Sequence, residues 1–554
     1  MEQTMSKIPA TQCAVQLVGP DQLRLNREKP VYKPTDHQIL AKVEAMGLCF
    51  SDLKLLHQFS EHARKGEIVS GIDGAILDEY PAYQPGDKPT VPGHECVCRI
   101  IEIGSKVKKH KVGDRCIVQS DWRKILTAAS NGAFGYNFEG ALQEYILFDE
   151  RIVIEPGTGD KYLIPVDSEC NAAAAALVEP WACVECSYVN VERQTPKAGG
   201  RMLVVVDAGR KVKGLAEAMT AGKPAMIDAI GVSAVEGLSV NPLCCCGELA
   251  SEAYDDIVYF GTKAETIEKL NDALARNGII NIVLGGGKID REVEVGVGRL
   301  HYGLTRWIGT AGDNAADSYK IIPANGEVKA GNSVIVIGAG GPMGQMHVIR
   351  ALCLGFNVRV VGTDFDDGRL AALSAKANPL AAKNGCEFEA VNTGKTPVEA
   401  GFDYYSIMAP VGALVADAIV HAKPGALINI FAGIPAPVKQ VLDLNAYISK
   451  GLFMFGTSGS LIGDMIIVRD KMESGLLDTG CSLDAVSGIA GAIDGIEAVK
   501  NRTMAGKIVV YPELSNMPLI PLNKLAEKYP TVAAKLKHGM WTTEAEKELL
   551  KVAK

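Results

Sequence analysis

Hydrophobic and polar positions alternate over short stretches from the start of the chain to about residue 150. Runs such as AVQLV, QILAKVEAMG and ECVCRIIEIG are separated by Gly, Pro and Asp. Alternation with a period of two is typical of half-buried strands, and Gly, Pro and Asp mark the turns between them. The pattern predicts an all-β, barrel-like module. An Ala-rich stretch from about residue 171, NAAAAALVEPWACVEC, predicts a helix that leads out of it.

A different pattern begins near residue 201 and occurs twice. Apolar, strand-like runs alternate with helical segments and glycine turns, first from RMLVVVDAG and again from NSVIVIGAGGPMG. Alternating βαβ units predict a parallel sheet that is covered by helices on both faces. The chain is therefore expected to belong to the α/β class, with a barrel-like β module and two tandem doubly wound, Rossmann-like units.

The two series resemble each other near their ends. GIINIVLGGG in the first corresponds to GALINIFAG in the second, and both are followed by the related motifs GTAG and GTSG. We interpret this as a tandem duplication of one nucleotide-domain-like unit, with two unrelated α/β domains as the alternative. The expected domains are the β module over 1–192, completed by about 506–554, an inserted repeat over 193–325 and a second repeat over 326–505.

Composition and charge limit the binding partners and the cellular location that we expect. The chain has 554 residues, 57 basic and 65 acidic side chains and a net charge of -8, and it has no block of Lys and Arg, so nucleic acid is not an expected partner. We find no apolar stretch long enough to span a membrane and no signal-peptide pattern, and we expect a cytoplasmic protein. The 14 cysteines lie largely within apolar runs, which is typical of a reducing compartment rather than of a disulfide framework. We also expect a homo-oligomer, a dimer or a tetramer.

The second series carries a dinucleotide-binding pattern. The strand Val334 to Ile337 is followed by GAGGPMG and then by a helix. Glycines at such a turn let the backbone approach a pyrophosphate at the helix N-terminus. Asp364, at the end of the next strand, would bind the ribose hydroxyls and favour NAD over NADP, whereas Arg369 keeps NADP possible. The candidate cofactor-binding residues are Gly338, Gly340, Gly341, Gly344, Asp364 and Arg369.

The inserted repeat departs from this pattern at the same turn. In VVVDAGRKVKG, Asp207 stands in place of the first glycine and Lys213 in place of the third. A carboxylate where a pyrophosphate approaches is repulsive. The inserted repeat is thus expected to be a structural or oligomerisation element, with binding of some other nucleotide or effector as the alternative.

Three separated motifs predict a metal site: Gly47-Leu-Cys49-Phe-Ser51-Asp52, Pro92-Gly-His94-Glu95 and Val178-Glu179-Pro180. A catalytic zinc ion uses three protein ligands and leaves one position open for substrate. Cys49, His94 and a carboxylate from Glu179 or Glu95 supply that set. Ser51 is then a candidate proton relay, and Asp52 a candidate partner that orients His94.

These motifs, in this order and followed by the glycine turn and Asp364, resemble the medium-chain zinc-dependent alcohol and polyol dehydrogenases. The chain is most similar to the sorbitol dehydrogenase branch and to L-sorbose-1-phosphate reductase-like enzymes, over roughly 1–190 and 326–530. The resemblance implies a GroES-like catalytic domain, zinc at Cys49, His94 and Glu179, and Glu95 as an exchanging ligand. The cysteine-rich lobe that binds a second, structural zinc in this family has no counterpart in DWRKILTAASNGAFGYNFEG, so one catalytic zinc is expected.

The expected activity is therefore hydride transfer between NAD(P) and a secondary alcohol or ketone of a polyol, sugar or sugar phosphate. Ser51, Asp52 and Glu95 are the predicted catalytic residues. Two alternatives stay open at this point. One is a zinc-free quinone or enone reductase of the same superfamily, and the other is a nucleotide-sensing or scaffold protein built on the duplicated unit.

Overall fold

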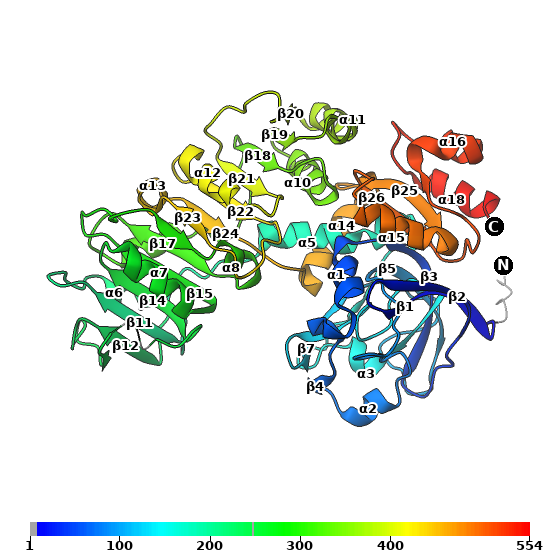
Figure 1. Ribbon diagram of the computed structural model, residues 1–554. Coiled ribbons are helices and arrows are strands. Elements are labelled where there is room, and N and C mark those ends of the chain that lie inside the picture. The colour runs from blue at the N-terminus through cyan, green and yellow to red at the C-terminus, as the bar shows by residue number, and fades with distance from the viewer. Residues whose placement is uncertain (1–7, 246, 248) are drawn as a thin grey trace. The chain divides into compact units, whose positions relative to one another are not determined.

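A computed structural model describes residues 8–245, 247 and 249–554 (Figure 1). The first seven residues, part of the stretch considered above for a signal peptide, lie outside the described residues. The chain forms two compact units. The first combines the described residues up to Glu185 with Gly459–Lys554, and the second runs from Cys186 to Ser458. The chain returns to the first unit at Gly459, which differs from the return near residue 506 that the sequence suggested.

The first unit is built on an eight-stranded sheet with the order β10-β6-β5-β3-β26-β25-β27, to which β9 adds by pairing with β3. Strands β25 and β26 come from the C-terminal segment and pair in parallel, whereas β3, β5 and β6 are antiparallel neighbours. Among the described residues the strand order has two free ends, so the predicted barrel-like module is an open sheet, not a closed barrel. The strands are β3 (Gln38–Gly47), β5 (Glu95–Ile103), β6 (Arg115–Val118), β9 (Tyr145–Asp149), β10 (Leu163–Pro165), β25 (Leu483–Gly488), β26 (Lys507–Tyr511) and β27 (Ile520–Pro521).

The first unit also contains a hairpin, a small sheet and several helices. Strands β1 (Thr11–Gly19) and β2 (Gln22–Pro30) form a hairpin, and a three-stranded sheet has the order β4-β7-β8. Helix α1 (Phe50–Gln58) begins three residues after β3 ends, and α5 (Val178–Val189) follows the Ala-rich α4 (Ala172–Ala176), as the sequence predicted. The members of the three-stranded sheet are β4 (Ile68–Ser70), β7 (Asp121–Thr127) and β8 (Asn131–Ala133).

The second unit contains two six-stranded parallel sheets with the same topology. Their orders are β13-β12-β11-β14-β15-β17 and β20-β19-β18-β21-β22-β24. Numbered within each repeat, both are 3-2-1-4-5-6, the order of a dinucleotide-binding Rossmann fold. The inserted repeat uses β11 (Arg201–Val206), β12 (Met226–Ile230), β13 (Asn241–Leu243), β14 (Tyr254–Phe260), β15 (Leu274–Val283) and β17 (Arg306–Thr310). The second repeat uses β18 (Ser333–Ile337), β19 (Arg359–Asp364), β20 (Glu387–Asn392), β21 (Tyr404–Ile407), β22 (Leu427–Ile430) and β24 (Phe453–Phe455).

The two repeats join through equivalent short strands. Strand β16 (Val293–Val295) lies between the fifth and sixth strands of the inserted repeat, and β23 (Gln440–Leu442) has the same place in the second. They pair antiparallel with Glu294 opposite Val441 at the centre. The middle residue of each strand thus faces its own counterpart, and the first residue of each strand pairs with the last residue of the other, which is the pattern of a two-fold, isologous interface. The sheet edges β17 and β24 also contact each other (Figure 1).

The join between the repeats is both apolar and hydrogen-bonded. One hydrophobic cluster includes Ile257 and Ile280 of the inserted repeat together with Ile428 and Ile430 of the second. Burial of apolar surface in a shared core makes the repeats one structural unit. Asn445 adds two bonds across the join: it accepts from the Ile289 N–H at 2.9 Å and donates to the Ile289 carbonyl at 3.1 Å.

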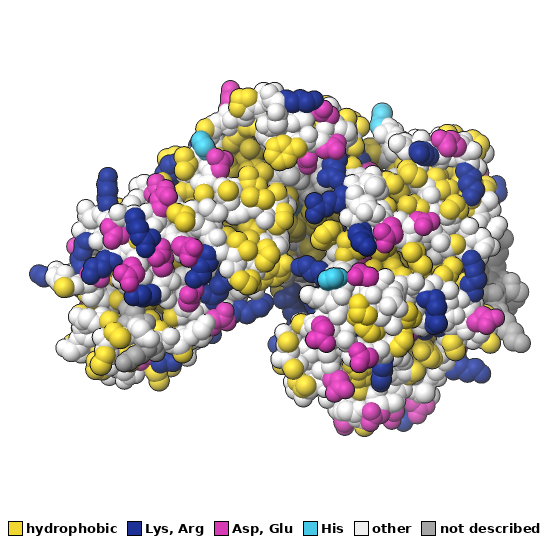
Figure 2. Space-filling view, viewed as in Figure 1, with side chains coloured by type: hydrophobic (Ala, Val, Ile, Leu, Met, Phe, Trp, Pro, Cys, Tyr) yellow, Lys and Arg dark blue, Asp and Glu magenta, His cyan; other side chains and the backbone are white. Residues whose placement is uncertain are grey.

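Surface features agree with the charge pattern of the sequence. On the face in Figure 2, acidic and basic side chains are intermixed over the inserted repeat, with no extended patch of one sign. No helix among the described residues has the length and apolar character that crossing a membrane requires.

Candidate active site

Cys49 and His94 are brought together by two turns that leave neighbouring strands. Cys49 is the N-cap of α1, directly after β3, and His94 precedes β5, which pairs with β3. The backbone N–H of Cys49 donates to Asp52 Oδ2 at 3.2 Å, which closes the first turn of α1. Asp52 Oδ1 lies 3.0 Å from His94 Nδ1. Asp52 therefore holds the turn of Cys49 and the turn of His94 together. Because it contacts Nδ1 of His94, the other ring nitrogen, Nε2, is the one available toward Cys49.

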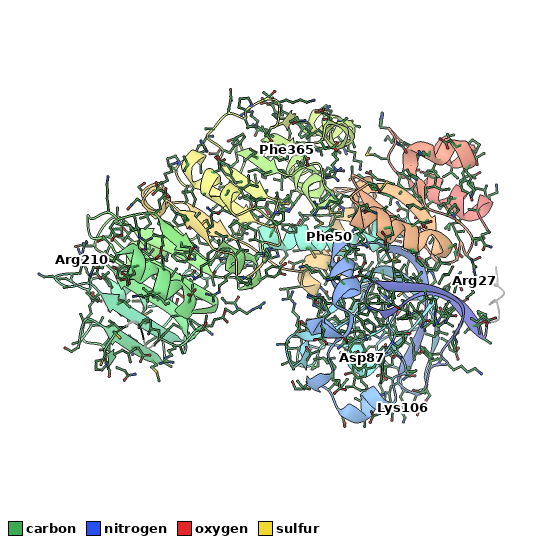
Figure 3. All side chains as sticks on the ribbon, viewed as in Figure 1. Arg27, Phe50, Asp87, Lys106, Arg210 and Phe365 are labelled. Atoms are coloured by element: carbon green, nitrogen blue, oxygen red, sulfur yellow. The ribbon has the colours of Figure 1, made fainter. Side chains whose placement is uncertain are left out.

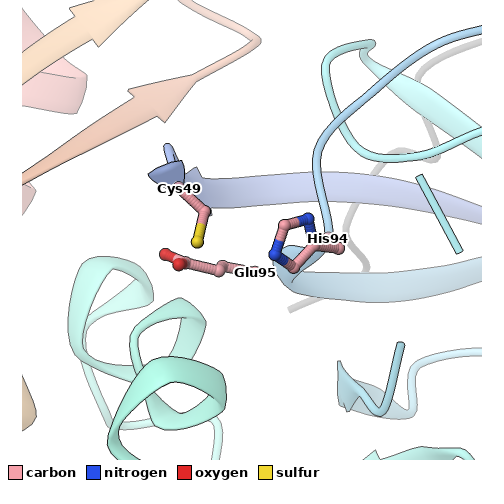
Figure 4. A group of neighbouring side chains, drawn as sticks. All are labelled: Cys49, His94 and Glu95. Carbon is pink, nitrogen blue, oxygen red and sulfur yellow. The ribbon is translucent and has the colours of Figure 1, made fainter. Parts of the chain in front are cut away.

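The predicted metal-binding atoms converge. Among the described residues, Cys49, His94 and Glu95 form a group whose ligand atoms lie within 4.8 Å of one another (Figure 4). His94 is 5% exposed and Glu95 is fully buried. Glu95 Oε2 is buried without a hydrogen-bond partner. A thiolate, an imidazole and an unpaired carboxylate oxygen are the donor set of a catalytic zinc ion with one open position, so the residues fit that metal.

Gly47 makes room for this carboxylate. A Cβ atom at residue 47 would lie 2.1 Å from Glu95 Oε2, closer than any real contact. The first glycine of the motif is thus explained by the space that the Glu95 side chain occupies, not by a turn conformation.

Ser51 lies between the side chains of Cys49 and His94. Its hydroxyl donates to Cys49 Sγ at 3.0 Å and lies 3.1 Å from His94 Nε2. It is therefore beside the position that the ligand atoms surround, as a proton relay requires.

Glu179 is buried near the group but is not one of its three members. Burial raises the pKa of its carboxyl to about 7; the charge of His94 opposes this rise and that of Glu95 adds to it. The thiol of Cys183, one helical turn later, lies 3.7 Å from Glu179 Oε1. The structure therefore brings Cys49, His94 and Glu95 together most closely and leaves Glu179 as a neighbouring carboxyl.

Sequence reasoning missed Lys507. Its ammonium donates to Glu95 Oε1, and both side chains are buried. Burial lowers the pKa of Lys507, but the Glu95 carboxylate outweighs this and holds it above the usual value. Lys507 is the first residue of β26, 412 positions from Glu95, and no local pattern in KIVVY signals the pairing. Lys507 thus binds one carboxylate oxygen of Glu95, and the other oxygen, Oε2, is the one without a hydrogen-bond partner.

Arg64 and Tyr136 also lie beside this group and were missed. The rings of Tyr136 and His94 are 5.8 Å apart, and the Arg64 guanidinium lies 5.4 Å from the centre of the Tyr136 ring. Arg64 is paired with the carboxylate of Asp121 at 2.9 Å. Tyr136 therefore lies beside His94, and Arg64 lies over the Tyr136 ring.

The glycine turn of the second repeat has the geometry of a dinucleotide site. Gly338 has φ +86°, and its N–H bonds to the Thr363 carbonyl at 2.9 Å. A Cβ at Gly344 would lie 2.3 Å from the Gly338 carbonyl oxygen, and one at Gly340 would lie 2.6 Å from Asp364 Oδ2. Both positions therefore require glycine. Gly341, the N-cap of α10 (Pro342–Leu352), has a weaker requirement for glycine. Nothing lies within 4 Å of a Cβ atom at this position.

Asp364 ends β19 beside this turn. Its Oδ2 accepts from the Gly340 N–H at 3.0 Å, and Oδ1 accepts from the Phe365 N–H at 2.8 Å. Phe365, labelled in Figure 3, is 78% exposed. Arg369 lies in the first turn of α11 (Asp367–Asn384), where its N–H donates to Asp366. The acidic group at the end of the second strand is thus in the place that a ribose-binding carboxylate occupies in this fold.

The same turn in the inserted repeat is closed by protein side chains. Asp207 Oδ2 accepts from the Tyr259 hydroxyl at 2.8 Å, and Lys213 pairs with Asp313 at 3.0 Å. The Glu236 carboxylate accepts the N–H groups of Gly214 and Ala216, each at 2.7 Å, at the start of α6. Helix α6 (Leu215–Ala218) has only four residues. An anionic side chain therefore lies at the helix start, the place where a Rossmann fold binds a pyrophosphate.

Comparison with known proteins was consistent with this geometry. Residues 35–157 match the alcohol dehydrogenase GroES-like domain. Mannitol-1-phosphate 5-dehydrogenase of Aliivibrio fischeri is 22% identical over 354 residues, which cover 56% of this chain and 77% of that protein. The zinc-type alcohol dehydrogenase-like protein YdjJ of Escherichia coli, itself uncharacterised, is 25% identical over 306 residues, or 49% of this chain and 78% of that protein.

A solved structure described as an alcohol dehydrogenase from Sinorhizobium meliloti 1021 has a TM-score of 0.50 at 12% identity, and covers 91% of this chain and 99% of its own. This likeness concerns the fold. Together, the matches confirm that the chain resembles the zinc-type alcohol and polyol dehydrogenases and has a mixed α/β fold of their kind.

Proposed function

We propose that this chain, an oxidoreductase of the zinc-type alcohol and polyol dehydrogenase kind, transfers a hydride between NAD(P) and a secondary alcohol or ketone of a polyol, sugar or sugar phosphate. The observation that carries the proposal is the convergence of Cys49, His94 and Glu95, with the buried Oε2 of Glu95 lacking a partner. The name of the Aliivibrio relative supports the substrate class.

Zinc, when bound, supplies a Lewis acid for the substrate oxygen, and the nicotinamide supplies the hydride acceptor. The side chains of Cys49, His94 and Glu95 would hold the metal, with Glu179 as a further carboxyl nearby. Lys507 holds Glu95 Oε1 and so directs Oε2 toward the ligand group. Asp52 fixes the ring of His94.

We propose that Ser51 Oγ relays the proton of the substrate hydroxyl: the oxygen accepts that proton while the serine gives its own hydroxyl proton to solvent water. Ser51 Oγ is placed for this because it lies within 3.1 Å of both Cys49 Sγ and His94 Nε2. The Arg64 and Asp121 pair would bind further hydroxyl groups, since it offers a donor and an acceptor together. In the second repeat, Gly338, Gly340, Gly341 and Gly344 would admit the pyrophosphate, and Asp364 the adenosine ribose. Arg369 would be the contact for a 2′-phosphate if NADP were used.

Cys49→Ala tests the proposal most directly. We expect it to remove bound zinc, measured by elemental analysis, and to lower kcat/KM by at least about 1,000-fold, since the loss of a metal ligand removes several kcal/mol of stabilisation. Circular dichroism should show an intact fold. Cys13→Ala, at a half-buried cysteine outside the ligand group, is the matched control and should keep both zinc and turnover.

A screen of polyols, sugar phosphates and ketones, followed by nicotinamide absorbance, provides the activity readout. Full turnover by a metal-free Cys49→Ala protein would instead favour a zinc-free reductase. Nucleotide binding without zinc-dependent turnover on any substrate would favour a sensor. Light scattering would test the expected dimer or tetramer, which stays a prediction.

A further inference from the structure

Helix α8 of the inserted repeat (Val297–Tyr302) packs against the second repeat at the carboxyl ends of two of its strands. His301 Nδ1 lies 3.3 Å from the carbonyl oxygen of Ile430, the last residue of β22. A Cβ at Gly456, the residue after β24, would lie 2.9 Å from the Cα of His301. The buried His301 therefore sits at the ends of the fifth and sixth strands of the second sheet.

The neighbouring Tyr302 extends this contact. A side chain at Gly433 would meet the Tyr302 hydroxyl at 2.8 Å, so the hydroxyl lies directly against the loop that follows β22. Phe431 lies in the same loop, with its ring 6.3 Å from that of His301 and 4.7 Å from that of His347 in α10. The loop is held from the inserted repeat on one side and from α10 on the other.

Arg306 of the inserted repeat adds a further contact with the segment that follows β24. Arg306, the first residue of β17, contacts Glu192 at 2.7 Å with both side chains buried, and its Nη2 donates to the Gly456 carbonyl at 3.1 Å. Thr457, the next residue, has a buried hydroxyl without a hydrogen-bond partner. A buried hydroxyl without a hydrogen-bond partner thus lies one residue after Gly456, which Arg306 of the inserted repeat contacts.

This end of the sheet is where one half of a dinucleotide binds. In a sheet of order 3-2-1-4-5-6, each half of the cofactor lies over one half of the carboxyl edge. Asp364, at the end of the second strand, marks the adenosine half, so the nicotinamide half falls to β21, β22 and β24. The contacts of His301 in α8 are with the ends of β22 and β24.

We infer that the inserted repeat completes the nicotinamide half of the nucleotide site of the second repeat, with His301 and Tyr302 as positioning residues for segments 430–433 and 456–457. This inference rests on the proposed NAD(P) binding. It gives the inserted repeat a role in binding although its own turn is closed by Asp207 and Glu236. Because the two repeats pair through β16 and β23 about a two-fold axis, helix α8 of the inserted repeat lies at the proposed nucleotide site of the second repeat.

Titration of the full-length chain with NADH and with ADP-ribose, which lacks the nicotinamide, tests the inference. His301→Leu keeps the side-chain volume and removes the contact with the Ile430 carbonyl, and should weaken NADH about five- to tenfold, as expected for the loss of one hydrogen bond. ADP-ribose affinity should stay within about twofold. Tyr302→Phe, which removes only the hydroxyl, should show the same selectivity with a smaller effect.

Ser449→Ala is the matched control. Ser449, the last residue of α13 (Leu444–Ser449), is the counterpart of Tyr302, but its side chain is exposed and bonds within its own helix, so both affinities should be unchanged. Equal weakening of NADH and ADP-ribose, or no weakening by either variant, would overturn the inference while leaving the proposed function intact. Failure of the wild-type chain to bind either nucleotide would overturn both. If His301→Leu does not fold, the Tyr302→Phe result decides.

Discussion

The two repeats of the second unit share a topology but differ at one turn. Both sheets have the order 3-2-1-4-5-6, and both turns follow the first strand. In the second repeat the turn leads into an 11-residue helix, whereas in the inserted repeat it leads into a four-residue helix at whose start two N–H groups bind Glu236. The two repeats therefore share a strand order but differ in the space and the charge at the first turn, the place where a Rossmann fold binds a pyrophosphate.

The second difference lies at the end of the second strand. Thr363 pairs with Ile337 and is followed by Asp364. The equivalent strands of the inserted repeat can be counted in the same way. There Ile230 pairs with Val205, and the count puts Val232 at the position that Asp364 has in the second repeat. The inserted repeat therefore lacks both the pyrophosphate turn and the ribose carboxylate, and only the second repeat is expected to bind a dinucleotide.

Gly344→Ala should have the largest effect on this comparison. The added Cβ would lie 2.3 Å from the Gly338 carbonyl oxygen, and a backbone group cannot move as a flexible side chain does. Strain of this kind costs up to about 3 kcal/mol, so NADH affinity should fall about 100-fold in fluorescence titrations. Lys213→Ala, at the equivalent position of the inserted repeat, should leave NADH affinity unchanged. Equal losses in the two variants would show that both turns take part in binding.

Asp364→Asn should have an intermediate effect, on the choice of cofactor. The neutral amide keeps an oxygen for the Gly340 N–H but no longer repels a 2′-phosphate. We expect the ratio of kcat/KM for NAD to that for NADP to fall about tenfold, which corresponds to about 1.4 kcal/mol. Asp313→Asn in the inserted repeat is the control and should not change the ratio. An unchanged ratio in Asp364→Asn would remove this carboxylate from cofactor selection.

Glu236→Gln should have the smallest effect. Glu236 is exposed, so loss of its charge at the start of α6 should lower the free energy of unfolding by less than about 1 kcal/mol. NADH should still bind with a stoichiometry of one per chain in calorimetry. Appearance of a second bound nucleotide would mean that Glu236 alone closes the inserted repeat, and that the two repeats differ less than their turns suggest.

The sequence by itself determined the local features of this protein. The two strand-and-helix series, the glycine turn with Asp364, and the ligand motifs around Cys49 and His94 are read from short segments, because periodicity and turn chemistry act over a few residues. The loss of the turn at Asp207 was also visible, since a carboxylate there changes the local charge.

Only the tertiary structure decided the long-range pairings. The ion pair between Lys507 and Glu95, the closing of the inserted turn by Glu236, the contact of His301 with Ile430 and the open end of the β-rich sheet join segments that are distant in sequence. No periodicity records such contacts, because they arise from how sheets and repeats pack once they have formed. The metal motifs could therefore be listed from the sequence, but only the fold shows that Glu95 is the carboxylate closest to Cys49 and His94 and that Lys507 pairs with it.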